Sequence, residues 1–126
     1  MQKLNTQYVK MMEVLYQYSM HNHLEFIDYK QLDESLQLLC RELIDDLEHI
    51  DFLISSTIKN YTIDRLNLVD LAIIRVAVFS ILKALEPAEI IINQAVEMTK
   101  TFSDLDDEKQ HKFNNSLIDN IYKKIK

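Results

Sequence analysis

Hydrophobic residues recur at helical spacing through most of the chain. The first group steps by three and four residues, which places its members on one face of a helix over residues 4–22. Its members are Leu4, Tyr8, Met11, Met12, Leu15, Tyr16 and Met20. Residues 23–30 are expected to form a short helix or an irregular link. A second group covers residues 32–58 and predicts either one long helix or two helices that meet near Asp45 and Asp46.

The pattern changes at residues 61–66, which interrupt the helical periodicity and predict a connector with one tight turn. Asn67 follows and is expected to cap the next helix, because a side-chain oxygen at that position accepts a hydrogen bond from a backbone N–H of the first turn. Asp70, three residues later, resembles the return half of a capping box. This helix is expected to continue to about Ala84. Its hydrophobic stripe contains small residues, which allow neighbouring helices to approach closely, so we expect it to be the central helix.

Two further helices are predicted in the last third of the chain. Pro87 suits the first turn of a helix, where its missing N–H leaves no hydrogen bond unmade, and this helix is expected to reach about Phe102. Residues 103–108 form a polar, acidic break. A last helix is expected over about residues 111–125, where hydrophobic positions again recur at helical spacing. The whole pattern therefore predicts an all-α fold.

Composition adds the size and the charge of the molecule. The chain has 126 residues and a mass of 14.9 kDa, with 48% hydrophobic residues, so a single globular domain is expected. Lys and Arg number 14 against 20 Asp and Glu, which gives a formal net charge of −6. That balance disfavours broad, charge-driven binding of nucleic acid, which needs a positive surface. Residues 109–126 are the exception, because they carry five Lys and one acidic residue.

Several classes of protein are excluded by what the chain lacks. It contains no glycine and one proline, which excludes glycine-rich phosphate loops and dinucleotide fingerprints. Its single cysteine, Cys40, excludes an internal disulfide and points to a reducing compartment. Its apolar runs are all shorter than the ~20 residues of a membrane span. These observations predict a soluble, cytoplasmic protein without a cofactor.

No group of residues in the sequence predicts catalysis or a metal site. His21 and His23 are two residues apart, so on a helix they point in different directions. The acidic pairs at residues 45–46 and 106–107 are most simply interpreted as solvated charges, because nothing forces either pair to converge across a cleft. Serine and threonine lack the glycine-rich elbow of a hydrolase. We therefore expect neither an enzyme nor a bound metal.

The start of the last helix carries the candidate binding chemistry. His111, Lys112, Phe113 and Asn115 combine a cation, an aromatic ring and an amide within five residues. A helix N-terminus and a lysine attract phosphate, an aromatic ring stacks on bases, and asparagine reads base edges. These features favour contact with nucleic acid. The alternative is structural: Phe113 is the first core residue of the helix, and Asn115 is an exposed amide.

The order and spacing of five segments resemble the NusB family of transcription antitermination factors. Residues 14–17 (Val-Leu-Tyr-Gln) are similar to the family's Ala-Leu-Tyr-Gln signature in its first helix. Residues 64–66 (Asp-Arg-Leu) and 70–79 resemble its central stretch, where an Arg-Leu precedes an acidic residue and then an Ile-Leu-Arg run. Residues 87–102 parallel its Pro…Ile-Asn-Glu-Ala-Val-Glu-Leu-Ala-Lys-x-Phe motif, and residues 111–119 parallel its Lys-Phe-Val-Asn-Gly-Val-Leu ending. The match covers most of the chain.

The resemblance implies an all-α, NusB-like bundle of about seven helices in two packed subdomains, with residues 1–126 as one domain. It also implies a factor in transcription antitermination and ribosomal RNA processing that acts by binding. The partners that it implies are single-stranded boxA-type RNA, the ribosomal protein NusE and, indirectly, the RNA polymerase elongation complex. The oligomeric state is left open between monomer and homodimer, because related proteins occur in both forms.

The resemblance further implies which residues make these contacts. RNA binding is implied for Lys112, Phe113, Asn115, His111, Arg75, Lys3 and Lys10. NusE binding is implied for Tyr16 and Asp70. Two alternatives stay open: Arg75 forms a structural ion pair or cap between helices, and Tyr16 belongs to the core. If the resemblance holds, Arg75, Lys112 and Phe113 are expected to lie together in one docking patch.

The chain departs from the family pattern at the presumed RNA surface. The family's first helix opens with an Arg-rich segment, whereas here only Lys3 and Lys10 carry positive charge. Asn114 and Ser116 replace an apolar residue and a glycine of the family. Loss of several phosphate-binding cations lowers RNA affinity by orders of magnitude at physiological salt. The alternative function is therefore a NusB-fold protein-interaction module with weakened or lost RNA binding.

Overall fold

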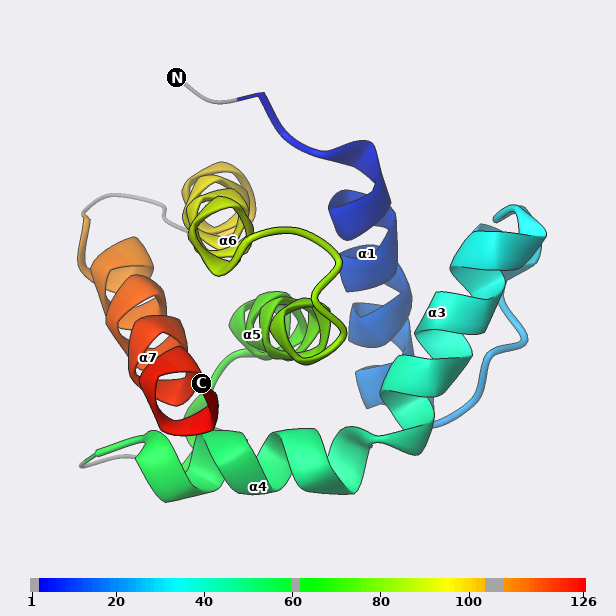
Figure 1. The fold of residues 1–126 in the computed structure, drawn as a ribbon. Helices are drawn as coiled ribbons and strands as arrows, with labels where there is room; N and C mark the ends of the chain where they lie inside the picture. The colour runs from blue at the N-terminus through cyan, green and yellow to red at the C-terminus, as the bar shows by residue number, and fades with distance from the viewer. Residues whose placement is uncertain (1–2, 60–61, 104–107) are drawn as a thin grey trace.

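The computed structural model describes residues 3–59, 62–103 and 108–126. Within these ranges the chain forms seven α-helices and one short 3-10 helix, η1, and it has no β-strand (Figure 1). In chain order they are α1 (Thr6–His21), α2 (Ile27–Lys30), α3 (Glu34–Asp45), α4 (Leu47–Thr57), η1 (Ile63–Arg65), α5 (Leu68–Leu82), α6 (Ala88–Phe102) and α7 (Lys109–Ile125). None of these helices combines the length and hydrophobicity that crossing a membrane requires. The predicted all-α fold is confirmed.

Helix α5 is the centre of the fold. It packs against α1 on one side and against α6 and α7 on the other, and α4 crosses beneath it in Figure 1. Ten of its fifteen residues are buried, which is the pattern of a helix surrounded by neighbours. The small side chains of Ala72, Ala77 and Ser80 are also buried, and they let the neighbouring helices approach closely. The predicted central helix is confirmed.

One hydrophobic core joins the described helices. Helix α1 lies between α5 and α3, whereas α6 and α7 pack against each other on the opposite side of α5 (Figure 1). Side chains from both sides belong to one cluster, whose largest fully buried members include Met11, Leu43, Ile74, Phe79 and Ile118. Each fully buried side chain of this kind contributes about 1.5–3 kcal/mol relative to its exposed state. The hydrophobic stripes of the sequence are therefore what hold the helices together.

The sequence predicted either one long helix or two helices over residues 32–58, and the structure has two. Helix α3 ends at Asp45 and α4 begins at Leu47. Asp33 caps the start of α3, where its carboxylate accepts a hydrogen bond from the Leu36 N–H at 2.8 Å. Such a cap satisfies one of the backbone donors that a helix start leaves without a partner inside the helix.

The predicted connector contains η1, whose single turn closes where the Leu66 N–H donates to the Ile63 carbonyl at 3.2 Å. Residues 60 and 61 lie outside the described part of the chain. Asn67 then caps α5, because its side-chain oxygen accepts a hydrogen bond from the Asp70 N–H at 2.8 Å. The tight turn and the cap are both confirmed, and together they direct the chain into the central helix.

Some predicted helix ends move by one or two residues. Helix α1 begins two residues later than predicted, because Asn5 caps it and accepts a hydrogen bond from the Gln7 N–H at 2.9 Å. Pro87 directly precedes α6 as its cap residue instead of standing in its first turn. Helix α7 begins two residues earlier than predicted. Residues 104–107, most of the predicted acidic break, lie outside the described part.

Helix α5 ends in a tight return that uses no glycine. Ala84 adopts a left-handed backbone conformation with φ of 52°. Its N–H donates to the Ile81 carbonyl at 3.0 Å, and the Leu85 N–H donates to the Ser80 carbonyl at 3.0 Å. These two hydrogen bonds form a Schellman motif, in which the left-handed position is usually glycine. The motif directs the chain from α5 into α6.

Cys40 lies in the core, where its side chain has no solvent exposure. Burial raises the pKa of its thiol from 9.0 to about 12, and only the thiolate reacts with alkylating agents. We expect iodoacetamide at about pH 8 to label the folded protein at least about a thousandfold more slowly than the urea-unfolded protein, because the thiolate fraction falls by that factor. Mass spectrometry of timed samples measures both rates. Similar rates would contradict the buried position.

Candidate nucleic-acid interface

The first turns of α7 face the connector between α4 and α5 across an open groove of about 670 Å³. The groove is lined by Lys59, Arg65, Leu66, Asn67, Asp70, Lys109, Gln110 and Phe113. One wall belongs to α7, and the other is formed by the end of the α4 segment, by η1 and by the first turn of α5. Segments far apart in the sequence therefore build one site, and the start of α7 is part of it.

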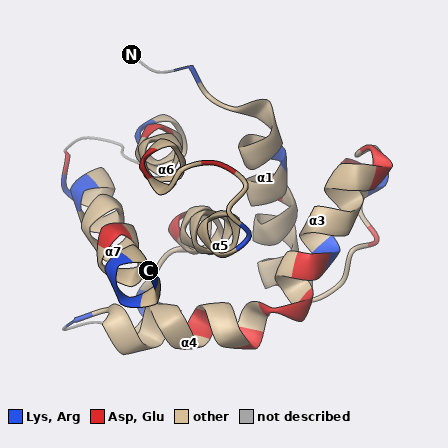
Figure 2. Ribbon diagram, in the orientation of Figure 1, with Lys and Arg blue, Asp and Glu red and all other residues tan. Residues whose placement is uncertain are grey.

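Three positively charged side chains line the groove. Lys59 follows α4, Arg65 ends η1 and Lys109 begins α7, and all three are exposed. Figure 2 shows Lys and Arg at both ends of α7, whereas acidic residues gather along α3 and α4. A local group of cations attracts phosphate even on a protein that is negative overall. Lys59 and Arg65 were not among the residues expected to bind RNA, although Arg65 stands in one of the segments that resemble the NusB family.

The ring of Phe113 and two amides complete the groove. Phe113 is half-buried: it packs against the hydrophobic core and also lines the groove. The structural interpretation of Phe113 as a core residue therefore describes part of its position, and the rest of the side chain faces the groove. Asn67 and Gln110 bring side-chain amides to the same groove. An aromatic ring and amides beside cations are the groups that stack on unpaired bases and hydrogen-bond to them.

A buried hydrogen-bond network beneath the groove joins α5, α6 and α7. The Asn114 amide donates to Asp70 Oδ1 at 3.1 Å and to Thr99 Oγ1 at 3.0 Å. Its carbonyl oxygen accepts from Gln110 Nε2 at 3.0 Å. Asn114 is 0% exposed and Asp70 is 1% exposed, and buried polar groups are stable where they are hydrogen-bonded. The network therefore fixes the start of α7 and, with it, the position of Phe113.

Arg75 lies away from this groove, at the junction of α5 with α4 and α1. Its Nε and Nη2 donate to the two carboxylate oxygens of Asp51 at 2.9 and 2.8 Å. Its Nη1 donates to Ser19 Oγ at 3.0 Å, and its side chain is 12% exposed. The structure therefore shows the ion pair between helices that was one of the two alternatives. The expected docking patch of Arg75 with Lys112 and Phe113 is wrong, because the guanidinium binds side chains of α4 and α1.

The sequence profile of the NusB family matches residues 6–123. The chain belongs to the NusB family. It is 41% identical over 101 residues to the transcription antitermination protein NusB of Clostridium botulinum (strain Alaska E43 / Type E3), which covers 77% of this chain and 72% of that protein. It is 39% identical over 102 residues to NusB of Ligilactobacillus salivarius (strain UCC118), which covers 77% and 75%.

A solved NusB structure has the same fold. T. maritima NusB matches with a TM-score of 0.80 and 27% identity, over 93% of this chain and 88% of that chain. The predicted NusB-like fold and the resemblance found in the sequence segments are confirmed. NusB proteins are transcription antitermination factors and do not form an enzyme family. Among the residues that the structure describes, no three His, Cys, Asp or Glu side chains gather as a metal site.

The burial of Asp70 corrects one expectation drawn from the NusB family. The resemblance implies that Asp70 lies on a surface that meets NusE, but its carboxylate faces inward onto Asn114. Carboxylates are rarely buried without partners, because their desolvation is unfavourable. The sequence did contain a signal for the burial of Asn114, which stands three and four residues before the buried Leu117 and Ile118 on the same face of α7.

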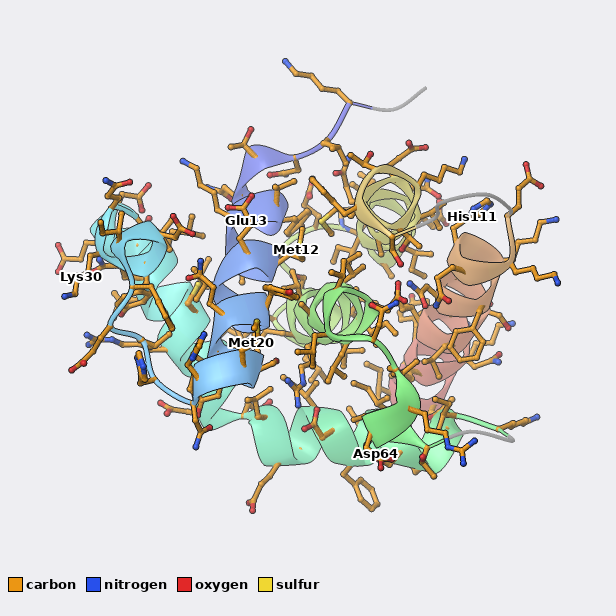
Figure 3. All side chains as sticks on the ribbon, turned by 180° about the vertical axis from the view of Figure 1, so that it is seen from behind. Met12, Glu13, Met20, Lys30, Asp64 and His111 are labelled. Atoms are coloured by element: carbon orange, nitrogen blue, oxygen red, sulfur yellow. The ribbon has the colours of Figure 1, made fainter. Side chains whose placement is uncertain are left out.

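The other α7 candidates lie on the exposed part of its first turns. Lys112 is exposed, and its Nζ lies 3.3 Å from Glu108 Oε2. An exposed ion pair of this kind contributes about 0–1 kcal/mol, so it opposes phosphate binding only weakly. His111 is half-buried and Asn115 is exposed. Figure 3 shows His111 at the start of α7, on the opposite side of the molecule from Lys30.

Lys3 and Lys10 lie apart from the groove. The Lys3 carbonyl accepts a hydrogen bond at 2.8 Å from Gln94 Nε2 on α6, which fixes the segment before α1. Lys10 is exposed on α1 and lines a separate hollow of about 240 Å³ with Glu13 and Asp28. Neither lysine lines the groove, so Lys3 and Lys10 do not share a surface with Phe113 there.

Tyr16 is half-buried and lines a hollow of about 250 Å³ between α1, the first turn of α5 and the end of α6. The full lining is Met12, Glu13, Tyr16, Gln17, Asp28, Val69 and Phe102. Phe102 is 40% exposed. Gln17 donates to Asp28 Oδ2 at 2.5 Å, whereas Gln17 Oε1 is buried without a hydrogen-bond partner among the described residues. Tyr16 therefore combines a core position with an accessible apolar surface.

Proposed function

We propose that this NusB-family protein holds single-stranded boxA-type RNA in the α7 groove and acts in transcription antitermination or ribosomal RNA processing. The observation that carries the proposal is the groove, where Lys59, Arg65 and Lys109 lie around the ring of Phe113. Cations hold phosphates while an aromatic ring stacks on a base. A single strand offers both groups at once, whereas a duplex keeps its bases stacked on each other. Lys112 and Asn115 are exposed on the same helix but do not line the groove.

NusE is the proposed partner at the hollow around Tyr16. The hollow has apolar walls and an acidic rim formed by Glu13 and Asp28. This chemistry suits a partner that inserts an apolar side chain flanked by basic groups. The pair of NusE and RNA would then link this protein to the RNA polymerase elongation complex.

The two proposed surfaces meet at the first turn of α5. Val69 lines the hollow and the next residue, Asp70, lines the groove. Helix α6 joins them in a similar way, because Phe102 lines the hollow and Thr99 binds Asn114 beneath the groove. When one ligand orders these turns, the protein loses less conformational entropy on binding the other ligand. Each ligand would therefore raise the affinity for the other.

Fluorescence anisotropy of a labelled boxA-type RNA, with and without NusE and over a range of salt, tests the proposal. NusE is expected to raise the RNA affinity. The slope of log affinity against log salt is expected to be about −2, because each of three phosphate contacts contributes about −0.7 on single strands. Lys109→Gln should reduce this slope by about 0.7, whereas Lys30→Gln, on the far side, should leave it unchanged. No gain in affinity with NusE would overturn the proposal.

A second candidate function is a protein-interaction module with weakened or lost RNA binding. The net charge of −6 favours it, as does the absence of an Arg-rich opening, where only Lys3 and Lys10 are basic. This function predicts that NusE binds with unchanged affinity when Lys112→Ala and Phe113→Ala are combined. Isothermal titration with NusE measures this. Loss of all partner binding in the double variant would exclude it.

A further inference from the structure

A second, smaller hollow adjoins the groove along α7. It measures about 120 Å³ and shares two lining residues with the groove, Lys59 and Phe113. Its remaining polar walls are Thr57 at the end of α4 and Ser116 and Asn120 on α7. The half-buried ring of Phe113 therefore separates two neighbouring hollows, and Lys59 reaches both of them.

The chemistry of the smaller hollow favours nucleic acid over a protein side chain. Among the residues that the structure describes, its lining includes a lysine and no acidic side chain. Ser116 and Asn120 offer a hydroxyl and an amide to base edges, and both residues are exposed. The hollow is too small and open to enclose a nucleotide, but it suits a base that rests against the ring with its sugar in solvent. The positive charge of Lys59 lies at the border between the two hollows.

We propose that two consecutive nucleotides of one RNA strand occupy the groove and the smaller hollow, with the Phe113 ring between their bases. This inference rests on the proposed function. Consecutive nucleotides are joined by one phosphate, and that phosphate must pass the border between the hollows. Lys59 lines both hollows, so its ammonium group binds the joining phosphate. Ser116 and Asn120 contact the base in the smaller hollow.

Abasic substitution along a boxA-type RNA tests the position of the ring. Each base in turn is removed, and the affinity is measured in the presence of NusE for the wild type and for Phe113→Leu. Leucine keeps an apolar side chain in the core but removes the stacking surface. We expect two adjacent positions at which loss of the base weakens wild-type binding roughly tenfold, with much smaller losses for Phe113→Leu. One sensitive position, or two separated ones, would overturn the inference.

A neutral methylphosphonate at the linkage between those two positions tests Lys59. It is expected to weaken wild-type binding and to leave the affinity of Lys59→Gln unchanged, because the variant no longer has the charge that the phosphate binds. Lys30→Gln is the matched control and should respond as the wild type does. A neutral linkage that weakens Lys59→Gln as much as the wild type would overturn this role.

The two proposals fail in different ways. If wild-type protein with NusE shows no affinity for the RNA at all, the proposed function is wrong and the inference falls with it. If the RNA binds but only one base depends on Phe113, the proposed function stands and the two-nucleotide arrangement is wrong. Asn120→Leu, which narrows the smaller hollow, should weaken binding, whereas Asn93→Leu on the exposed face of α6 should not.

Discussion

Asn114→Leu is expected to lower the free energy of unfolding by about 3 kcal/mol, although leucine suits a helix and a core. The change removes a hydrogen bond to the Asp70 carboxylate, which is 1% exposed and so cannot exchange the lost donor for water. Thr99 Oγ1 loses the donor that it accepts from but still donates to the Ala95 carbonyl, and Gln110 Nε2 loses its acceptor on Asn114. Hydrogen bonds to buried charged groups contribute more than neutral ones, which makes this loss larger than for an ordinary polar core residue.

Urea unfolding followed by circular dichroism measures the loss. Asn115→Leu is the matched control, because the neighbouring asparagine is exposed and its replacement should change stability by less than about 0.5 kcal/mol. Equal effects of the two variants would show that the network does not stabilise the fold. The resemblance to the NusB family implied an apolar residue at the position of Asn114, so the network is a feature in which this chain departs from the pattern that the resemblance implied.

Arg75→Met is expected to destabilise the protein by about 2 kcal/mol and to leave the salt dependence of RNA binding unchanged. Methionine keeps the aliphatic packing of the side chain, so the loss reports the guanidinium contacts. Those contacts are the bidentate pair with Asp51 and the hydrogen bond to Ser19. Asp51 is 31% exposed and can recover some hydration when the pair is broken, which keeps the expected loss below that of Asn114→Leu.

A double-mutant cycle with Asp51→Asn separates the ion pair from the packing of Arg75. The coupling energy between the two positions should account for most of the loss. Thermal or urea unfolding measures stability, and anisotropy at several salt concentrations measures RNA binding. A reduction of about 0.7 in the salt slope for Arg75→Met would instead show that Arg75 binds a phosphate, as the family resemblance implied.

The helices could be predicted because their determinants are local. The break between α3 and α4 near Asp45, the cap at Asn67 and the stripe of α5 each depend on residues within one or two turns. The helix ends that were predicted wrongly also depend on nearby residues. Asn5 competes with the start of the hydrophobic stripe, and its cap shortens α1 by two residues. Periodicity shows which face is buried, but capping decides where the helix begins.

The site could be predicted only in part, because it depends on contacts between distant segments. The start of α7 was recognisable from the residues around Phe113. The opposite wall was not, since Lys59 and Arg65 become part of the site only when the connector folds against α7. The partners of Asp70 and Arg75 were hidden for the same reason: Asn114 is 44 residues from the first, and Asp51 is 24 residues from the second.

The glycine-free return at Ala84 has a consequence for the unfolded chain. A left-handed alanine costs about 1 kcal/mol in the native backbone relative to an ordinary helical conformation. Glycine would relieve that strain, but it would also widen the range of conformations open to the denatured chain. A sequence without any glycine has a narrower unfolded ensemble throughout, and this corner, like Asn22 at the end of α1, is a place where the native backbone adopts the left-handed conformation without glycine. At the other turns of the chain, folding then loses less conformational entropy than it would with glycine there.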